Sequence, residues 1–133
     1  MIGHVVLDTD VASFILKRDT RADLFRPFIA GKLWALSFQS VAELEQWAEL
    51  RGWGARRKAR FENFLDGMVI LNPDRDVCKL WGRIRAAGKQ KGHPIDVGDS
   101  WIAATAVRYG VPLATHNQAH FRWVEGLTVL PVP

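Results

Sequence analysis

Little in this chain suits a secreted or membrane-bound protein. Cys78 is its only cysteine, so no intramolecular disulfide can form and a reducing cytoplasm is the expected compartment. No apolar run approaches the ~20 residues that cross a bilayer, so we expect no contact with a membrane. The opening residues, MIGHVVLD, contain neither a basic stretch nor a small-residue cleavage site, so no signal peptide is expected.

The chain also lacks internal repeats, low-complexity tracts and linkers, but it is rich in hydrophobic residues. It has 133 residues, of which 48% are hydrophobic, and this is enough for one domain with a substantial core. Basic residues exceed acidic residues by 18 to 14, which gives a formal net charge of +4. This mild excess is compatible with a polyanionic partner but does not require one.

Apolar runs of strand length alternate with helical patterns, which is typical of an α/β fold. The runs predict strands at residues 4–7, 32–37, 68–71, 111–115 and 127–130. The helical patterns predict helices at residues 10–19, 21–32, 40–52, 56–67, 74–90 and 99–110, with Pro27 interrupting the second. Strands joined through helices form a mostly parallel sheet, and ligands bind where the carboxyl ends of such strands meet.

Acidic residues are expected to gather at that edge of the sheet. Asp8 ends the first strand, Glu43 lies just beyond the second, and Asp99 opens the helix that leads to the fourth. Clustered carboxylates repel one another and raise one another's pKa values unless a cation compensates. Neither lysine nor arginine stands beside these three acids in the sequence. A divalent cation with oxygen ligands, Mg²⁺ or Mn²⁺, is therefore expected, and it could ionise a water for attack on a phosphate.

Most of these acids also have a structural explanation as helix caps. Asp10 could cap the helix that follows it, and Ser40 with Glu43 fits the S-x-x-E capping box. Asp96 could be the N-cap of the helix whose first turn contains Asp99. Capping is the better explanation for any one acid taken alone, so the predicted site depends on convergence. Asp8 is the exception, because it follows an apolar strand and no helical turn has yet begun there.

Three segments together resemble a known family in order and spacing. LDTD at 7–10 is similar to L-D-T-[ND], and SFQSVAEL at 37–44 is similar to S-x-x-[TS]-x-x-E-L. DSWIAATAVRYGVPLATHN at 99–117 is similar to D-x-x-I-A-A-x-A followed by L-x-T-x-[ND]. The set resembles a PIN-domain ribonuclease, specifically the VapC-type toxin of a toxin–antitoxin pair. The resemblance implies a single Rossmann-like PIN domain over residues 1–133, with a mostly parallel sheet flanked by helices.

The resemblance also implies an activity and its partners. It implies a Mg²⁺- or Mn²⁺-dependent endoribonuclease that acts on RNA, with transfer or ribosomal RNA as the family-level expectation. It implies a homodimer and a small antitoxin that blocks the site. Asp8, Glu43 and Asp99 match the three acidic positions that bind the metal and carry the catalysis. Supporting roles are implied for the hydroxyls of Thr9 and Ser40, and Asp96 is kept as a further supporting residue.

Two positions depart from the family pattern. The fourth acidic position is Asn117, whose amide oxygen can accept a hydrogen bond but adds no negative charge. The number of metal ions and the contact of Asp96 with metal therefore stay open. His120 stands where an aspartate or glutamate is often found. It is a candidate contact to RNA, although a surface histidine without such a role is the commoner case.

Basic and aromatic residues near the acids are candidate RNA contacts. The loop KQKGHP at 89–94 carries Lys89, Lys91 and His93 just ahead of the acids. Trp101 lies next to them and could stack on a base. The basic stretch at 51–60 is better explained as a solvated helix face. Core or dimer positions are expected for three other tryptophans, Trp34, Trp47 and Trp81.

Three other interpretations compete with a nuclease. A haloacid-dehalogenase-like phosphatase also opens with D-x-D after a strand, but it requires a threonine where Ala12 stands. A phospho-receiver domain requires an aspartate at the end of the third strand, where only Asp74 is available, beyond a proline. A catalytically degenerate PIN fold that binds RNA or a partner remains open because of Asn117 and His120. The three intact acids argue against it, since a binding domain needs no mutually repelling carboxylates.

Overall fold

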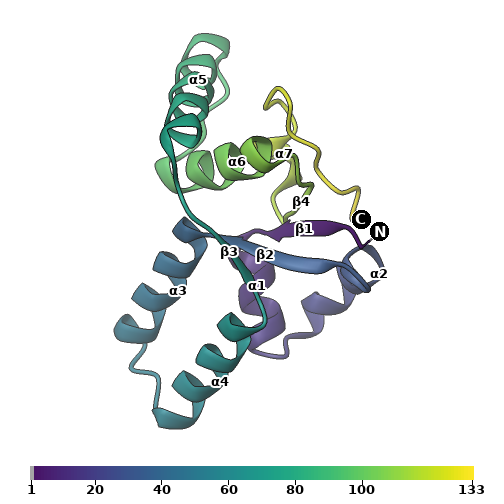
Figure 1. The fold of residues 1–133 in the computed structure, drawn as a ribbon, viewed down its shortest axis with the longest axis vertical. Coiled ribbons are helices and arrows are strands. Elements are labelled where there is room, and N and C mark those ends of the chain that lie inside the picture. The colour runs from purple at the N-terminus through teal and green to yellow at the C-terminus, as the bar shows by residue number, and fades with distance from the viewer. Residues whose placement is uncertain (1) are drawn as a thin grey trace.

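A four-stranded, all-parallel sheet is the centre of the structure, a computed structural model that describes residues 2–133 (Figure 1). The strands are β1 (His4–Leu7), β2 (Leu33–Ser37), β3 (Val69–Leu71) and β4 (Leu113–Ala114), in the spatial order β3-β2-β1-β4. In the register, Val5 pairs with Trp34 and Leu7 pairs with Ala114. The α/β class and the parallel sheet are therefore as the sequence predicts.

Helices cover both faces of this sheet. On one side lie α1 (Thr9–Leu16), the 3₁₀ helix η1 (Thr20–Leu24), α2 (Arg26–Ile29), α3 (Phe38–Leu50) and α4 (Ala55–Asp66). On the other side lie α5 (Arg75–Lys91), α6 (Val97–Tyr109) and α7 (Gln118–Phe121) (Figure 1). Within residues 2–133, no helix combines the length and the apolar character needed to cross a membrane.

The alternation of side chains along β1 supplies two hydrophobic cores. Val5 and Leu7 pack with Leu44 and Phe61 on the side of α1 to α4. Val6 packs on the opposite side with the core of α5, α6 and β4. Successive strand residues point to opposite faces, and a parallel strand covered on both faces is apolar throughout. This explains why the buried run of β1 continues up to Asp8 without a polar residue.

The strand order reverses its direction between β1 and β4. The chain runs from β1 to β2 and β3 with its helices on one face, and then returns through α5 and α6 over the other face to β4. In open parallel sheets, ligands bind at the carboxyl ends of the strands where the order reverses in this way. Asp8 follows β1 and Thr115 follows β4, so both lie at this reversal point.

Two predicted elements were wrong. Residues 127–130 do not form a fifth strand, because only Val129 bridges Leu113 and the pairing stops before Pro131, which has no N–H to donate. The predicted helix at 21–32 is instead η1 followed by the single turn α2. Pro27 lies in the first turn of α2, directly after Arg26, where a missing N–H costs nothing, so it does not interrupt this helix.

The predicted cap of the first helix was also wrong. Capping was the structural explanation offered for Asp10, but α1 already begins at Thr9, with only Asp8 between it and β1. Asp8 is the N-cap, and its side chain accepts a hydrogen bond from the backbone N–H of Thr9. The expectation that no helical turn begins at Asp8 therefore fails, because strand and helix join without a loop.

The second strand and helix join in the same way. Helix α3 begins at Phe38, and the side chain of Ser37, the last residue of β2, accepts from the N–H of Gln39. The predicted capping box of Ser40 and Glu43 is therefore wrong, because both residues lie within the helix. Their side chains are left for other contacts.

Three tryptophans expected in the core do pack against it. Trp34 and Trp47 are partly buried against the first core, and Trp81 is partly buried against the second. The indole N–H of Trp34 donates to the backbone carbonyl of Ile29 at 2.9 Å, and this hydrogen bond fixes the orientation of the ring. Trp53, which the sequence did not single out, is more deeply buried and meets Phe61 edge to face.

We predict that Phe61→Ala lowers the free energy of unfolding by about 3–5 kcal/mol, because it removes a fully buried ring from the first core. Urea unfolding followed by circular dichroism measures this. Leu50→Ala is the matched control, since Leu50 is 75% exposed, and it should change stability by less than ~0.5 kcal/mol. Equal losses in the two variants would contradict this description of the core.

Candidate active site

Asp8 is the most deeply buried carboxylate of the predicted set, with 4% of its surface exposed. Its Oδ1 accepts from the backbone N–H of Thr9 at 2.8 Å, and its Oδ2 accepts from the hydroxyl of Thr115 at 2.7 Å. Burial raises the pKa of Asp8 to about 6, and the two hydrogen bonds oppose part of this rise. The negative charges of Asp10 and Glu43 make a smaller contribution to this raised value.

Asp99 lies in the first turn of α6 and is less buried. Its backbone N–H donates to Oδ1 of Asp96 at 2.7 Å, so Asp96 is the N-cap of α6, as the sequence predicts. Burial, as the largest cause, and the charges of Asp8, Asp96 and Glu43 together raise the pKa of Asp99 to about 7. The structure therefore brings together acids that lie as much as 91 residues apart in the sequence.

Glu43 reaches the same edge from the second turn of α3. Its Oε1 accepts from Nε2 of Gln39, one turn earlier, at 3.0 Å. Its charge acts on both Asp8 and Asp99, which places it within electrostatic range of each. Gln39 was not singled out in the sequence, because a glutamine in a helix carries no distinctive pattern.

Buried hydroxyl groups form hydrogen bonds around Asp8 at the carboxyl edge of the sheet. The hydroxyl of Thr9 donates to Oγ of Ser40 at 2.8 Å, and this bond joins the first turns of α1 and α3. Thr115 is a site residue that the sequence did not single out, although it lies within the quoted L-x-T-x-[ND] motif. Its hydroxyl donates to Asp8 and accepts from the backbone N–H of Asn117 at 3.0 Å. Asn117 therefore supports Asp8 through its backbone.

The donor set suits a divalent cation. Over residues 2–133, the salt bridges join Arg21, Arg26 and Arg108 to acids elsewhere, and none includes Asp8, Glu43, Asp96 or Asp99. As the side chains stand in this part of the chain, no three His, Cys, Asp or Glu residues are grouped closely enough to hold a metal. Hydrogen bonds occupy both oxygens of Asp8 and one of Glu43. Hard carboxylate oxygens without a cationic partner are nevertheless the ligands that Mg²⁺ and Mn²⁺ prefer.

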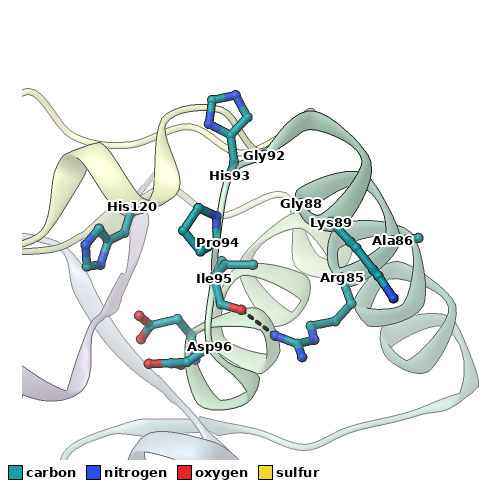
Figure 2. A pocket seen from close by; sticks show the side chains of 11 residues that line it. Arg85, Ala86, Gly88, Lys89, Gly92, His93, Pro94, Ile95, Asp96 and His120 are labelled. Carbon is teal, nitrogen blue, oxygen red and sulfur yellow. Dashed lines mark hydrogen bonds between the residues drawn. The ribbon is translucent and has the colours of Figure 1, made fainter.

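A cavity of about 890 Å³ opens beside the acids, between α5, the loop at 92–96 and α7. Asp96 and Asp99 line one end of it (Figure 2 labels Asp96). His120 comes from the α7 side, and Lys89 comes from the opposite side on α5 (Figure 2). The guanidinium of Arg85 donates to the backbone carbonyl of Ile95, and this hydrogen bond ties the loop at 92–96 to α5.

The structure separates the other candidate RNA contacts. His93 lines the same cavity, and its ring stacks on Trp123 with centroids 5.3 Å apart. Lys91 lies instead in a second cavity of about 350 Å³, away from the acids. Trp101 stacks on Trp81 with centroids 5.1 Å apart, so one face of its ring is already covered. Stacking of Trp101 on a base stays a prediction.

We predict that the chain in EDTA becomes less stable as the pH rises from about 4 to 7. The pKa values of Asp8 and Asp99 in the fold lie above their ordinary value of 3.8, so the folded state holds protons that the unfolded chain has already released. In Asp99→Asn, part of this loss disappears. Between pH 4 and pH 8, the free energy of unfolding of the variant should therefore rise relative to that of the wild type by on the order of 1 kcal/mol, after allowance for solvent screening.

Urea unfolding of both proteins at pH 4, 6 and 8 measures this difference. Asp66→Asn is the matched control, because Asp66 is exposed at the end of α4, and its stability should follow the wild type at each pH. A wild-type chain that gains stability over this range would contradict the electrostatic description of the site.

Comparison with known proteins agrees with this geometry. The PIN domain family model matches residues 5–126. The chain is 32% identical over 123 residues to ribonuclease VapC2 of Haemophilus influenzae, covering 92% of each protein. VapBC2 of Rickettsia felis, solved with a promoter DNA fragment, aligns with a TM-score of 0.83 at 20% identity over 96% of this chain and 97% of that one. VapBC-5 of Mycobacterium tuberculosis, described as a member of the VapBC family of toxin–antitoxin systems, aligns with a TM-score of 0.73 at 24% identity over 96% and 98%. The chain therefore belongs to the PIN-domain family, and within it to the VapC ribonucleases.

Proposed function

We propose that this chain is a Mg²⁺- or Mn²⁺-dependent endoribonuclease in which Asp8, Glu43 and Asp99 hold the metal. The observation that carries the proposal is that Asp8 and Asp99 are carboxylates buried beside other acids: burial first, and the neighbouring negative charges after it, raise their pKa values. A site that pays this electrostatic penalty without a basic partner fits a bound cation better than a purely structural role. The family membership supports RNA as the substrate.

The residues of the chain divide the work at this site. The hydroxyl of Thr115 and the N–H of Thr9 fix the orientation of the Asp8 carboxylate. Gln39 fixes one oxygen of Glu43, and Asp99 stands at the end of the cavity, where a substrate can approach. When bound, a divalent cation supplies a Lewis acid that lowers the pKa of a water and stabilises the negative charge on an attacked phosphate. Asp96 supports Asp99 by capping its helix.

The cavity beside the acids is the proposed path of the RNA backbone. Lys89, His93 and His120 line it and present groups that can contact phosphate oxygens. The acids at one end then face the phosphodiester that is cut. Transfer or ribosomal RNA is the proposed substrate class.

We further propose an antitoxin as partner and a homodimer as the working assembly. The solved relative from Mycobacterium tuberculosis belongs to a toxin–antitoxin system, and its fold matches this chain over nearly its full length. An antitoxin that covers the acids or the cavity would block both metal and RNA. Purified antitoxin-free protein is therefore needed for every activity measurement.

We predict that Asp8→Asn lowers the rate of RNA cleavage by about 100-fold or more, because it removes a charged metal ligand while keeping the shape of the side chain. Cleavage of an RNA pool with Mg²⁺, with Mn²⁺ and with EDTA measures this, and EDTA should abolish it. Asp66→Asn is the matched control and should cut like the wild type. Cleavage that survives both EDTA and Asp8→Asn would contradict the proposal, and absence of cleavage would favour a binding protein.

We predict that Lys89→Ala raises KM for RNA about 3- to 10-fold and leaves kcat nearly unchanged, because Lys89 lines the cavity but stands apart from the acids. The effect should shrink as salt is raised, since it comes from a phosphate contact. Lys58→Ala, on the exposed face of α4, is the matched control with no expected change. A fall in kcat with KM unchanged would contradict this path for the RNA.

A further inference from the structure

Glycine at position 98 leaves room for the Glu43 carboxylate. A Cβ atom at residue 98 would lie 2.7 Å from Glu43 Oε1, 3.0 Å from Gln39 Nε2 and 3.6 Å from Asp96 Oδ1. The first of these distances is shorter than any Cβ atom normally tolerates. The carboxylate of Glu43 therefore lies against the bare backbone of the first turn of α6, directly before Asp99.

Gln39 holds the same carboxylate from the side of α3. Its amide donates to Oε1 of Glu43 at 3.0 Å and packs over Gly98. An amide donor is neutral, so it can fix one carboxylate oxygen without competing with a cation for the charge. This hydrogen bond uses only Oε1, so the other carboxylate oxygen of Glu43 is left for a ligand.

We propose that Gly98 and Gln39 are positioning residues for the metal: together they hold the Glu43 carboxylate between α3 and the first turn of α6, and from there it reaches a cation shared with Asp8 and Asp99 when the metal draws the three side chains together. This inference rests on the proposed function of the acids. Neither residue touches the substrate, and each acts through Glu43. The absence of a side chain at position 98 therefore contributes to metal affinity.

The contacts of Gly98 indicate that its role in positioning Glu43 can be tested without loss of folding. The backbone of Gly98 is not in the left-handed region that favours glycine, and alanine favours helix more than glycine does. The atoms that a methyl group would meet are the ends of two flexible side chains, which can move aside at little cost. Gly98→Ala should therefore fold as well as the wild type while its Glu43 carboxylate is displaced. A residue with a merely structural role would show the opposite pattern.

The test is the affinity of the metal-free full chain for Mn²⁺, measured by calorimetry, together with the Tm in EDTA. For Gly98→Ala we expect about 10-fold weaker Mn²⁺ binding, in the range seen when the supports of metal ligands are removed, and an unchanged or higher Tm. Gln39→Ala should also weaken binding. Gly82→Ala is the matched control, because Gly82 lies in α5 with open space around it, and it should leave Mn²⁺ affinity unchanged.

A second pair of variants shows whether Gly98 acts through Glu43. In the Glu43→Ala background there is no carboxylate to displace, so adding Gly98→Ala should weaken Mn²⁺ binding no further. Equal weakening in both backgrounds, or a folded Gly98→Ala chain that binds Mn²⁺ like the wild type, would overturn the inference and leave the proposed function intact. A wild-type chain that binds no Mn²⁺ would contradict the proposed function itself, and this inference with it.

Discussion

The burial of mutually repelling carboxylates at the carboxyl edge of the sheet is the constraint on which the rest of the structure depends. Asp8 is almost fully buried, Asp99 is partly buried, and the charges of Glu43, Asp96 and Asp10 act on them. Around this edge lie neutral donors, among them the hydroxyl of Thr115 and the amide of Gln39. Neutral donors orient carboxylates without cancelling their charge, which leaves the negative potential available to a cation.

The fold concentrates this charge by joining strands to helices without loops. Asp8 directly follows β1 and Ser37 ends β2, and each caps the helix that begins at the next residue, with nearly the same backbone angles. The first turns of α1 and α3 are therefore brought against the sheet edge, where Thr9 and Ser40 hydrogen-bond. The reversal of strand order between β1 and β4 then adds Thr115 from the other side. Thr9 and Thr115, which are far apart in the sequence, thus donate hydrogen bonds to one carboxylate.

Much of this arrangement could be predicted from the sequence, and the failures have physical causes. Apolar runs that alternate with helical patterns predict the parallel sheet and its carboxyl edge, and the charge of Glu43 does act on Asp8 and Asp99 there. Capping rules failed at Asp10 and Ser40, since they judge a local window and cannot show that a helix starts directly from a strand. Thr115, Gln39 and Gly98 were missed because their roles depend on neighbours that only the fold provides. The fifth strand failed for a local reason, the proline at 131 that ends its pairing.

The most direct test of the central claim is the number of protons released when Mn²⁺ binds. Calorimetry at pH 6.5 in two buffers with different heats of ionisation measures this number. The pKa values of about 6 for Asp8 and about 7 for Asp99 mean that the metal-free site holds protons at this pH, and a cation must displace them. We expect the release of about one proton for each Mn²⁺ bound. The same heat in both buffers, which means binding without proton release, would contradict it.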